Sequence, residues 1–186
     1  MIKKSTILGI DPGTNLLGFG IISVDEKGKP QFVDMGVVDL RKEKDAYSKL
    51  AAIGAKIGAL CDEHHPDQMA IESPFYAKNA QVISKLGRAQ GAAIAAAAGR
   101  GIPVTEYAPR KAKIAICGNG AASKEQVETM VQKTLGVELE PKYLDATDAL
   151  AIALCHYYQT TSPLAGVSSA SSWEKFIAAN PGRVKK

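Results

Sequence analysis

The sequence of 186 residues contains no hydrophobic run near the roughly 18 residues that a membrane span needs. Its basic N-terminus, residues 1–5, is followed by an apolar run that already breaks at Asp11. That run is too short for a signal peptide, so a cytoplasmic protein is expected. Hydrophobic residues make up 46% of the chain, which is enough for one domain with a substantial core.

Cysteine is also scarce, and the positions of the cysteines argue against a zinc site and against a redox site. The three cysteines, Cys61, Cys117 and Cys155, lie far apart in the chain. No pair has the spacing of a zinc or redox motif, so reduced thiols are expected.

The first 159 residues also lack a marked excess of positive charge, although the net charge of the whole chain is formally +4. Residues 160–186 hold four basic side chains against one acidic side chain, which leaves +1 for the first 159 residues. A nucleic-acid partner must therefore be argued from local patches. The segment 160–186 is rich in serine, alanine and glycine and is predicted to be a flexible C-terminal tail after a domain of residues 1–159. Trp173 and Phe176 are its candidate anchors.

Hydrophobic periodicity predicts an α/β fold. Apolar residues alternate in the first part of the chain, as in strands, and recur at intervals of three and four later, as in helices. Strands are expected over residues 5–11, 17–24, 31–40, 68–72 and 103–107, and helices over residues 46–60, 79–99, 123–135 and 144–158. Ser123 and Gln126 have the spacing of a capping box. Antiparallel strands followed by alternating strands and helices predict a mixed five-stranded sheet flanked by helices.

Small residues recur at two places where a close contact is expected. Gly18 and Gly20 would let another backbone approach the second strand. In the helix over 79–99, small residues are spaced four apart, at Gly87, Gly91, Ala95 and Gly99. This stripe predicts close packing, either on the sheet of the same chain or at a homodimer interface, and composition leaves both open.

Four carboxylates stand where a divalent-metal site would need them. Asp11 and Glu72 each end an apolar strand, and Asp145 and Asp148 lie three apart on one face of a helix. Singly, each has an ordinary explanation, such as a turn at Asp11 or charge stabilisation at the helix start. Together they would repel one another unless a hard cation such as Mg²⁺ neutralised them. Such sites commonly hydrolyse phosphodiesters with two metal ions.

Aromatic and basic residues surround these acids in the sequence. Phe75 and Tyr76 follow Glu72, and each would either stack on a base or staple the following helix. Basic runs are usually solvated, but beside a carboxylate crevice they are better interpreted as phosphate contacts. The basic candidates are Lys78, Lys85, Arg88, Arg110, Lys111, Lys113 and Lys124.

The ordered set of these motifs resembles the RuvC-type Holliday junction resolvases over residues 5–158. The resemblance implies an RNase H-like fold, a homodimer, and symmetric nicking of four-way DNA junctions during recombination and repair. It also implies Mg²⁺ or Mn²⁺ as the cofactor and the RuvA–RuvB branch-migration complex as a partner. The matching segments are residues 10–14, 18–20, 70–72, 75, 77–79, 85–91 and 145–153.

The resemblance also implies roles for single residues. The family's four acidic positions match Asp11, Glu72, Asp145 and Asp148. Its DNA-facing aromatic residue matches Phe75, and its two basic positions near the scissile phosphate match Lys113 and Lys124. The sequence departs from the family pattern at residues 73–74, where Ser-Pro replaces the more usual Gln-Val, and at Thr147, where alanine is common.

Two other classes of protein share parts of this pattern. Actin-like kinases also begin with a strand, an aspartate and Gly-Thr, but they usually need two such domains and a second glycine-rich phosphate motif. This chain is too short and lacks that motif. A module that binds junctions without cutting them would not need four acids in one crevice.

Overall fold

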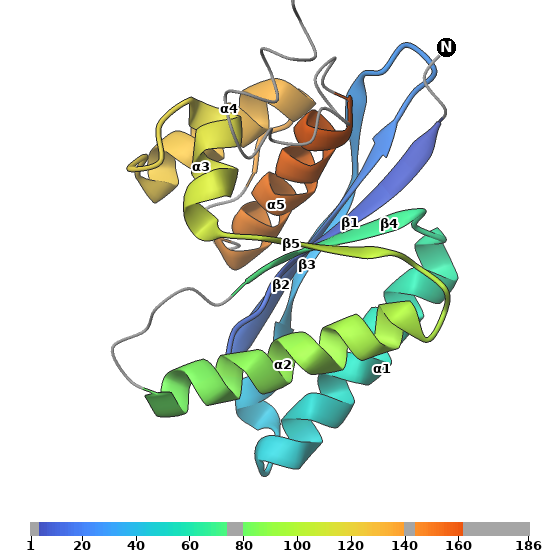
Figure 1. The fold of residues 1–186 in the computed structure, drawn as a ribbon, viewed down its shortest axis with the longest axis vertical. Coiled ribbons are helices and arrows are strands. Elements are labelled where there is room, and N and C mark those ends of the chain that lie inside the picture. Colours follow the sequence, from blue (N-terminus) through green and yellow to red (C-terminus); the bar gives the residue numbers. More distant parts are fainter. Residues whose placement is uncertain (1–3, 74–79, 140–143, 162–186) are drawn as a thin grey trace, which may run out of the picture.

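A mixed sheet of five strands forms the centre of the protein (Figure 1). The computed structural model describes residues 4–73, 80–139 and 144–161. The strand order is β3-β2-β1-β4-β5, with β1, β2 and β3 antiparallel and β4 and β5 added parallel to β1. The strands are β1 Ser5–Asp11, β2 Leu16–Val24, β3 Pro30–Asp39, β4 Gln68–Glu72 and β5 Val104–Tyr107. The predicted α/β class and the mixed five-stranded sheet are confirmed.

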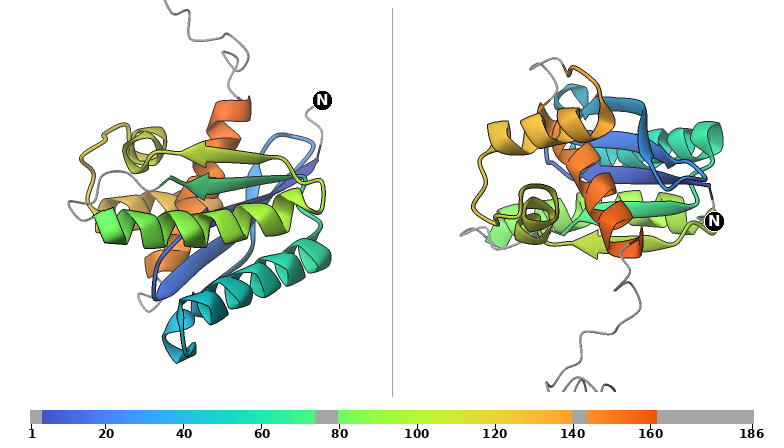
Figure 2. Two further views of the ribbon diagram at one scale, coloured as in Figure 1. Left: turned by 60° about the horizontal axis from the view of Figure 1, so that its bottom comes forward. Right: turned by 90° about the horizontal axis from the view of Figure 1, so that it is seen from above.

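Helices cover both faces of this sheet (Figure 2). α1 and α2 pack on one face, where Leu8, Ile10 and Ile57 belong to one hydrophobic cluster. α3, α4 and α5 pack on the other, where α5 crosses β1 and β2. The helices are α1 Ala46–His64, α2 Ala80–Ala98, α3 Pro109–Cys117, α4 Lys124–Leu135 and α5 Leu144–Thr161, with a short 3-10 helix, η1, at Leu40–Lys42.

The ends of the helices follow from their local sequence. α4 has the predicted capping box, in which Ser123 and Gln126 each accept a hydrogen bond from the other's backbone N–H. α3 was not predicted, although Pro109 opens it and Gly118, with a φ of 70°, ends it. Proline at the first position and glycine just after the last are typical helix signals, so this element was predictable.

Glycines allow α5 to lie directly on the backbone of β1 and β2. A Cβ atom added at Gly18 would lie 2.0 Å from the Asp145 carbonyl oxygen, and one at Gly9 would lie 2.1 Å from that of Ala149. At Gly20 it would lie 2.7 Å from the Leu150 side chain. The close approach expected at Gly18 and Gly20 is therefore present, and it sets the height of α5 above the sheet.

The small-residue stripe of α2 points away from the sheet. Gly87 and Gly91 are exposed, and an added Cβ atom would meet nothing within 4 Å at either position. Ala89, Ala93 and Ala97 pack against the core instead. The alternative in which the stripe packs on the chain's own sheet is therefore wrong.

Some predicted features lie outside the described residues. They include Phe75, Tyr76, Lys78 and the segment 162–186 with its candidate anchors. α5 runs to Thr161, three residues beyond the predicted end, and the domain boundary near residue 159 stays a prediction. Within the described ranges, none of the helices is both long and apolar enough to span a membrane.

Gly18→Ala should destabilise the protein, because the new methyl group would push α5 off the sheet. Overpacking of this kind costs about 1–3 kcal/mol and occasionally more. Gly54→Ala is the control, because an added Cβ atom there meets nothing within 4 Å and alanine favours a helix by about 0.5–1 kcal/mol. Urea unfolding of both variants measures the difference. Equal stability of the two would show that the contact with α5 is loose.

Candidate metal centre

Strand pairing brings the first two predicted acids to one edge of the sheet. β1 and β4 are parallel, with Ile10 opposite Ile71, so that Asp11 and Glu72 follow at the carboxyl ends of adjacent strands. Open α/β sheets commonly bind ligands at this edge. The two strands are distant in the sequence, because β4 begins at Gln68, 57 positions after Asp11.

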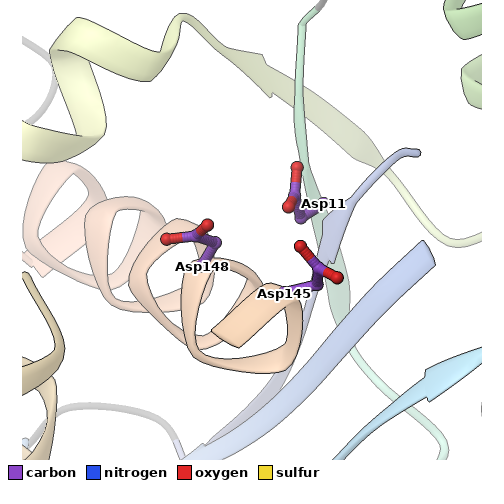
Figure 3. Close-up of side chains that lie close together, drawn as sticks. All are labelled: Asp11, Asp145 and Asp148. Carbon is purple, nitrogen blue, oxygen red and sulfur yellow. The ribbon is translucent and has the colours of Figure 1, made fainter. Parts of the chain in front are cut away.

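The first turns of α5 bring the other two acids to the same place. One carboxylate oxygen each of Asp11, Asp145 and Asp148 lies within 4.8 Å of the others (Figure 3). Glu72 shares with Asp11 and Asp148 a pocket of about 200 Å³, which Lys113 and Lys124 also line. The structure thus gathers all four predicted acids and two of the predicted lysines.

Burial and neighbouring negative charge raise the pKa of two of these carboxylates, Asp11 and Glu72. Burial, followed by the charges of Asp148 and Asp145, raises the pKa of Asp11 to about 7. Burial and the charges of Asp11 and Asp148 raise the pKa of Glu72 to about 8. Near neutral pH, Asp11 is therefore partly protonated and Glu72 mostly protonated unless positive charge compensates them. Carboxylate oxygens at this spacing are the ligands that hard divalent cations prefer, so the donor set fits such an ion.

Two lysines supply the positive charge at the rim of the pocket. The Lys124 Nζ atom donates to the Asp148 Oδ2 atom at 2.7 Å, and this hydrogen bond raises the pKa of Lys124. Lys113 is half-buried and donates to the Ala122 carbonyl oxygen at 2.7 Å. Their charges lower the pKa of Glu72 in part, but its value stays high.

The other predicted DNA-contacting residues are more dispersed. Arg110, in the first turn of α3, lies with its aliphatic stem against Gly120 in the loop before α4. Arg88 lies on α2, on the other face of the sheet, so the structure does not bring it into the carboxylate pocket. Phe75 and Lys78 lie outside the described residues.

A polar network between α5 and the sheet was not predicted. The Tyr107 hydroxyl contacts His156 Nδ1 at 2.9 Å, and His156 Nε2 contacts the Gln68 Oε1 atom at 2.6 Å. Since the Gln68 oxygen can only accept, His156 donates from Nε2 and accepts from Tyr107. The network joins α5 to β4 and β5, and its Tyr107 lies opposite Glu72 in the pairing of these two strands. Nothing in the spacing of these three residues reveals it.

Comparison with known proteins identifies the family. Residues 7–156 match the family described as crossover junction endodeoxyribonuclease RuvC. The chain belongs to the RuvC family. The RuvC of Christiangramia forsetii is 50% identical over 183 residues, which is 98% of this chain and 94% of that protein. The RuvC of Bacteroides fragilis is 49% identical, over 99% of this chain and 98% of that protein.

Solved RuvC structures have the same fold. Thermus thermophilus RuvC matches with a TM-score of 0.74 and 35% identity, covering 82% of this chain and 94% of that one. The structure of T. thermophilus RuvC in complex with Holliday junction substrate matches with a TM-score of 0.75 and 31% identity, over 84% of this chain and 96% of that one.

These matches confirm several of the sequence-based predictions for this RuvC-family chain. The fold is RNase H-like, and the protein is a crossover junction endodeoxyribonuclease, a hydrolase of phosphodiester bonds. The actin-like and non-catalytic alternatives are thereby set aside.

The raised pKa of Asp11 predicts how pH changes stability without metal. An ordinary aspartate in the unfolded chain has a pKa of about 3.9, so folding takes up a proton between about pH 4 and pH 7. The free energy of unfolding should therefore fall as pH rises through this range and stay low above it. Asp11→Asn removes this effect. The free energy of unfolding of the Asp11→Asn variant, relative to that of the unaltered protein, should therefore rise by about 2 kcal/mol between pH 5 and pH 7.5. This corresponds to about 4–8 °C in Tm.

Thermal melting in EDTA at both pH values measures this advantage. Asp62→Asn, on α1, is the control, because Asp62 is exposed and its partner Arg100 holds its pKa low. A constant difference in Tm between the Asp11→Asn variant and the unaltered protein at the two pH values would contradict the raised pKa.

Proposed function

We propose that Asp11, Glu72, Asp145 and Asp148 form the catalytic site with which this chain makes paired, symmetric nicks in four-way DNA junctions. The observation that carries this proposal is the convergence of these acids from β1, β4 and α5 on one pocket with two lysines at its rim. Carboxylates that keep protons near neutral pH are poised to exchange them for a divalent cation.

The cofactor we propose is Mg²⁺, with Mn²⁺ as a substitute and two ions in each site. We assign Asp11 as the shared ligand, because it lies close to Asp145 and Asp148 and its charge also acts on Glu72. When bound, such ions activate the attacking water and stabilise the leaving oxygen of the phosphodiester.

The basic residues hold the DNA in this proposal. Lys113 and Lys124 line the carboxylate pocket, where their ammonium groups can contact oxygens of the scissile phosphate. Contacts further along the DNA are assigned to Arg88 and Arg110. Phe75 and Lys78 are assigned to the DNA surface from the sequence alone, with Phe75 stacking on an unpaired base.

Asp11→Asn should abolish cleavage, because it removes the charge of the shared ligand, and it should leave junction binding intact. Single-turnover cleavage of a labelled synthetic four-way junction with Mg²⁺ measures the first effect, and a binding titration in EDTA measures the second. Asp62→Asn should cut like the unaltered protein. Cutting by the Asp11→Asn variant at a near-normal rate would refute the assignment.

We also propose that the chain acts as a homodimer through the outer face of α2. Gly87, Gly91 and Ala95 are exposed, and Val82 and Ile83 on the same helix are 39% and 37% exposed. Exposed glycines inside a helix cost about 0.5–1 kcal/mol each relative to alanine, which a close helix contact would offset. A two-fold dimer also matches the two-fold symmetry of paired cuts in a junction.

Gly91→Arg should therefore give a monomer that loses paired nicking, because the side chain would fill the proposed seam. Gly54→Arg is the matched control, since Gly54 is also a helical glycine with open space around it. Sedimentation velocity at micromolar concentration distinguishes the two. A dimer that persists in the Gly91→Arg variant would place the interface elsewhere.

We propose three further features on the basis of the family resemblance or of the sequence. They are a partnership with the RuvA–RuvB complex, a cytoplasmic location, and a division into a nuclease domain of residues 1–159 and a tail of residues 160–186.

A further inference from the structure

A second groove lies on the opposite face of the sheet from the carboxylate pocket. It is bounded by the turn between β1 and β2, the start of α1 and the first half of α2. Leu50, Ile53 and Ala89, which belong to the cluster under α1 and α2, form its apolar wall. Its volume is about 510 Å³, against about 200 Å³ for the carboxylate pocket.

The groove is rich in positive charge. Its cationic lining residues are Lys44, Lys49, Lys85 and Arg88. Its acidic lining residues are Glu43 and Asp45. The Asp45 Oδ1 atom already accepts from the backbone N–H groups of Tyr47 and Ser48 at 2.8 Å, as the cap of α1. Positive charge therefore predominates along the groove.

In the described ranges of the chain, these cations form no ion pair with an acid. Lys49 donates to the Thr14 carbonyl oxygen at 2.9 Å and to the Asn15 side chain at 3.1 Å, which are both neutral acceptors. Among the described residues, no carboxylate lies within 4.0 Å of the Lys44, Lys85 or Arg88 charge. Like charges gathered around one groove without such partners favour an anionic ligand.

Surface arginines elsewhere on the protein behave differently. Arg41 and Arg100 each form a two-pronged contact with a carboxylate, Asp39 and Asp62 respectively, at 2.7–2.8 Å. Pairing with a carboxylate is thus available to surface cations of this protein, whereas Lys44, Lys85 and Arg88 have no such partner within the described part of the chain.

The groove adjoins the cutting site around the end of β1. Asp11 is the last residue of β1, and Thr14 and Asn15 of the next turn line the groove. Lys49 ties this turn to α1. A DNA strand with one phosphate at Asp11 that continued over this end of the sheet would meet the groove next.

We propose that this groove binds the sugar-phosphate backbone of the junction beyond the cut site, through Lys44, Lys49 and Lys85 together with Arg88. This inference rests on the proposed function, since it assigns a further part of the same substrate. The groove supplies affinity and orientation, whereas the carboxylate pocket performs the reaction. Phosphate contacts of this kind position a duplex without reading its sequence.

Charge reversal at the edges of the groove tests the proposal. The full chain carrying Lys44→Glu and Lys85→Glu should bind a labelled four-way junction in EDTA at least tenfold more weakly at low salt. The slope of log affinity against log salt should become shallower by about 1.8, because each lost phosphate contact removes about 0.9. Lys49 is left unaltered because it holds the turn at Asn15.

Lys27→Glu is the control, because Lys27 is exposed on the turn between β2 and β3, at the opposite end of the sheet. It should bind almost as tightly as the unaltered chain. The proposal is overturned if the double variant matches this control in both affinity and slope. Failure of the proposed function would show separately, as cutting by the Asp11→Asn variant.

A photo-crosslinking amino acid at position 44, compared with one at position 27, tests the location independently. Position 44 should crosslink to nucleotides flanking the cut site on the junction. Crosslinking to DNA at position 44 no greater than at position 27 would overturn the proposal, as would binding of an acidic polypeptide there in preference to the junction.

Discussion

The contact of α5 with the bare backbone of β1 and β2 is the constraint on which the site depends. Gly18 lies opposite Asp11 in the strand pairing and beneath the Asp145 carbonyl oxygen. The same glycine therefore sets the height of the helix and the separation of the carboxylates above it. A side chain at this position would move one pair of acids away from the other, so the packing and the chemistry share one structural cause.

The negative charges that this packing brings together oppose folding. Burial, followed by the charges of the neighbouring acids, raises the pKa of Asp11 and of Glu72, and nearby lysine charge compensates only part of this effect. Functional sites commonly hold such unfavourable groupings, which the surrounding core must support. Here the support comes from the clusters on both faces of the sheet and from the network of Tyr107, His156 and Gln68, which joins α5 to β5 and β4.

The two faces of the sheet have different tasks in this arrangement. The face covered by α3, α4 and α5 carries the acids and the two lysines of the pocket. The face covered by α1 and α2 carries the basic groove and the exposed glycines of α2. Asp11 lines the pocket and the turn that follows it lines the groove, so a substrate that passes around the end of β1 can engage both.

The sequence by itself determined the elements and the identity of the acids. Periodicity located the strands and four of the five longer helices within a few residues. A helix or strand that buries one face has apolar residues at its own period, and this pattern is visible in the local sequence. α3 was missed despite Pro109 and Gly118, because a helix of nine residues with two buried side chains shows little apolar periodicity.

Only the tertiary structure decided how these parts meet. It placed Lys113 and Lys124 at the acids and Arg88 on the other face, and it turned Gly87 and Gly91 outward. It also joined Lys49 to the turn at Asn15. Such contacts link residues far apart in the chain, and they depend on which face of a packed helix a side chain occupies. The local sequence does not encode that choice, because the packing of the whole sheet fixes it.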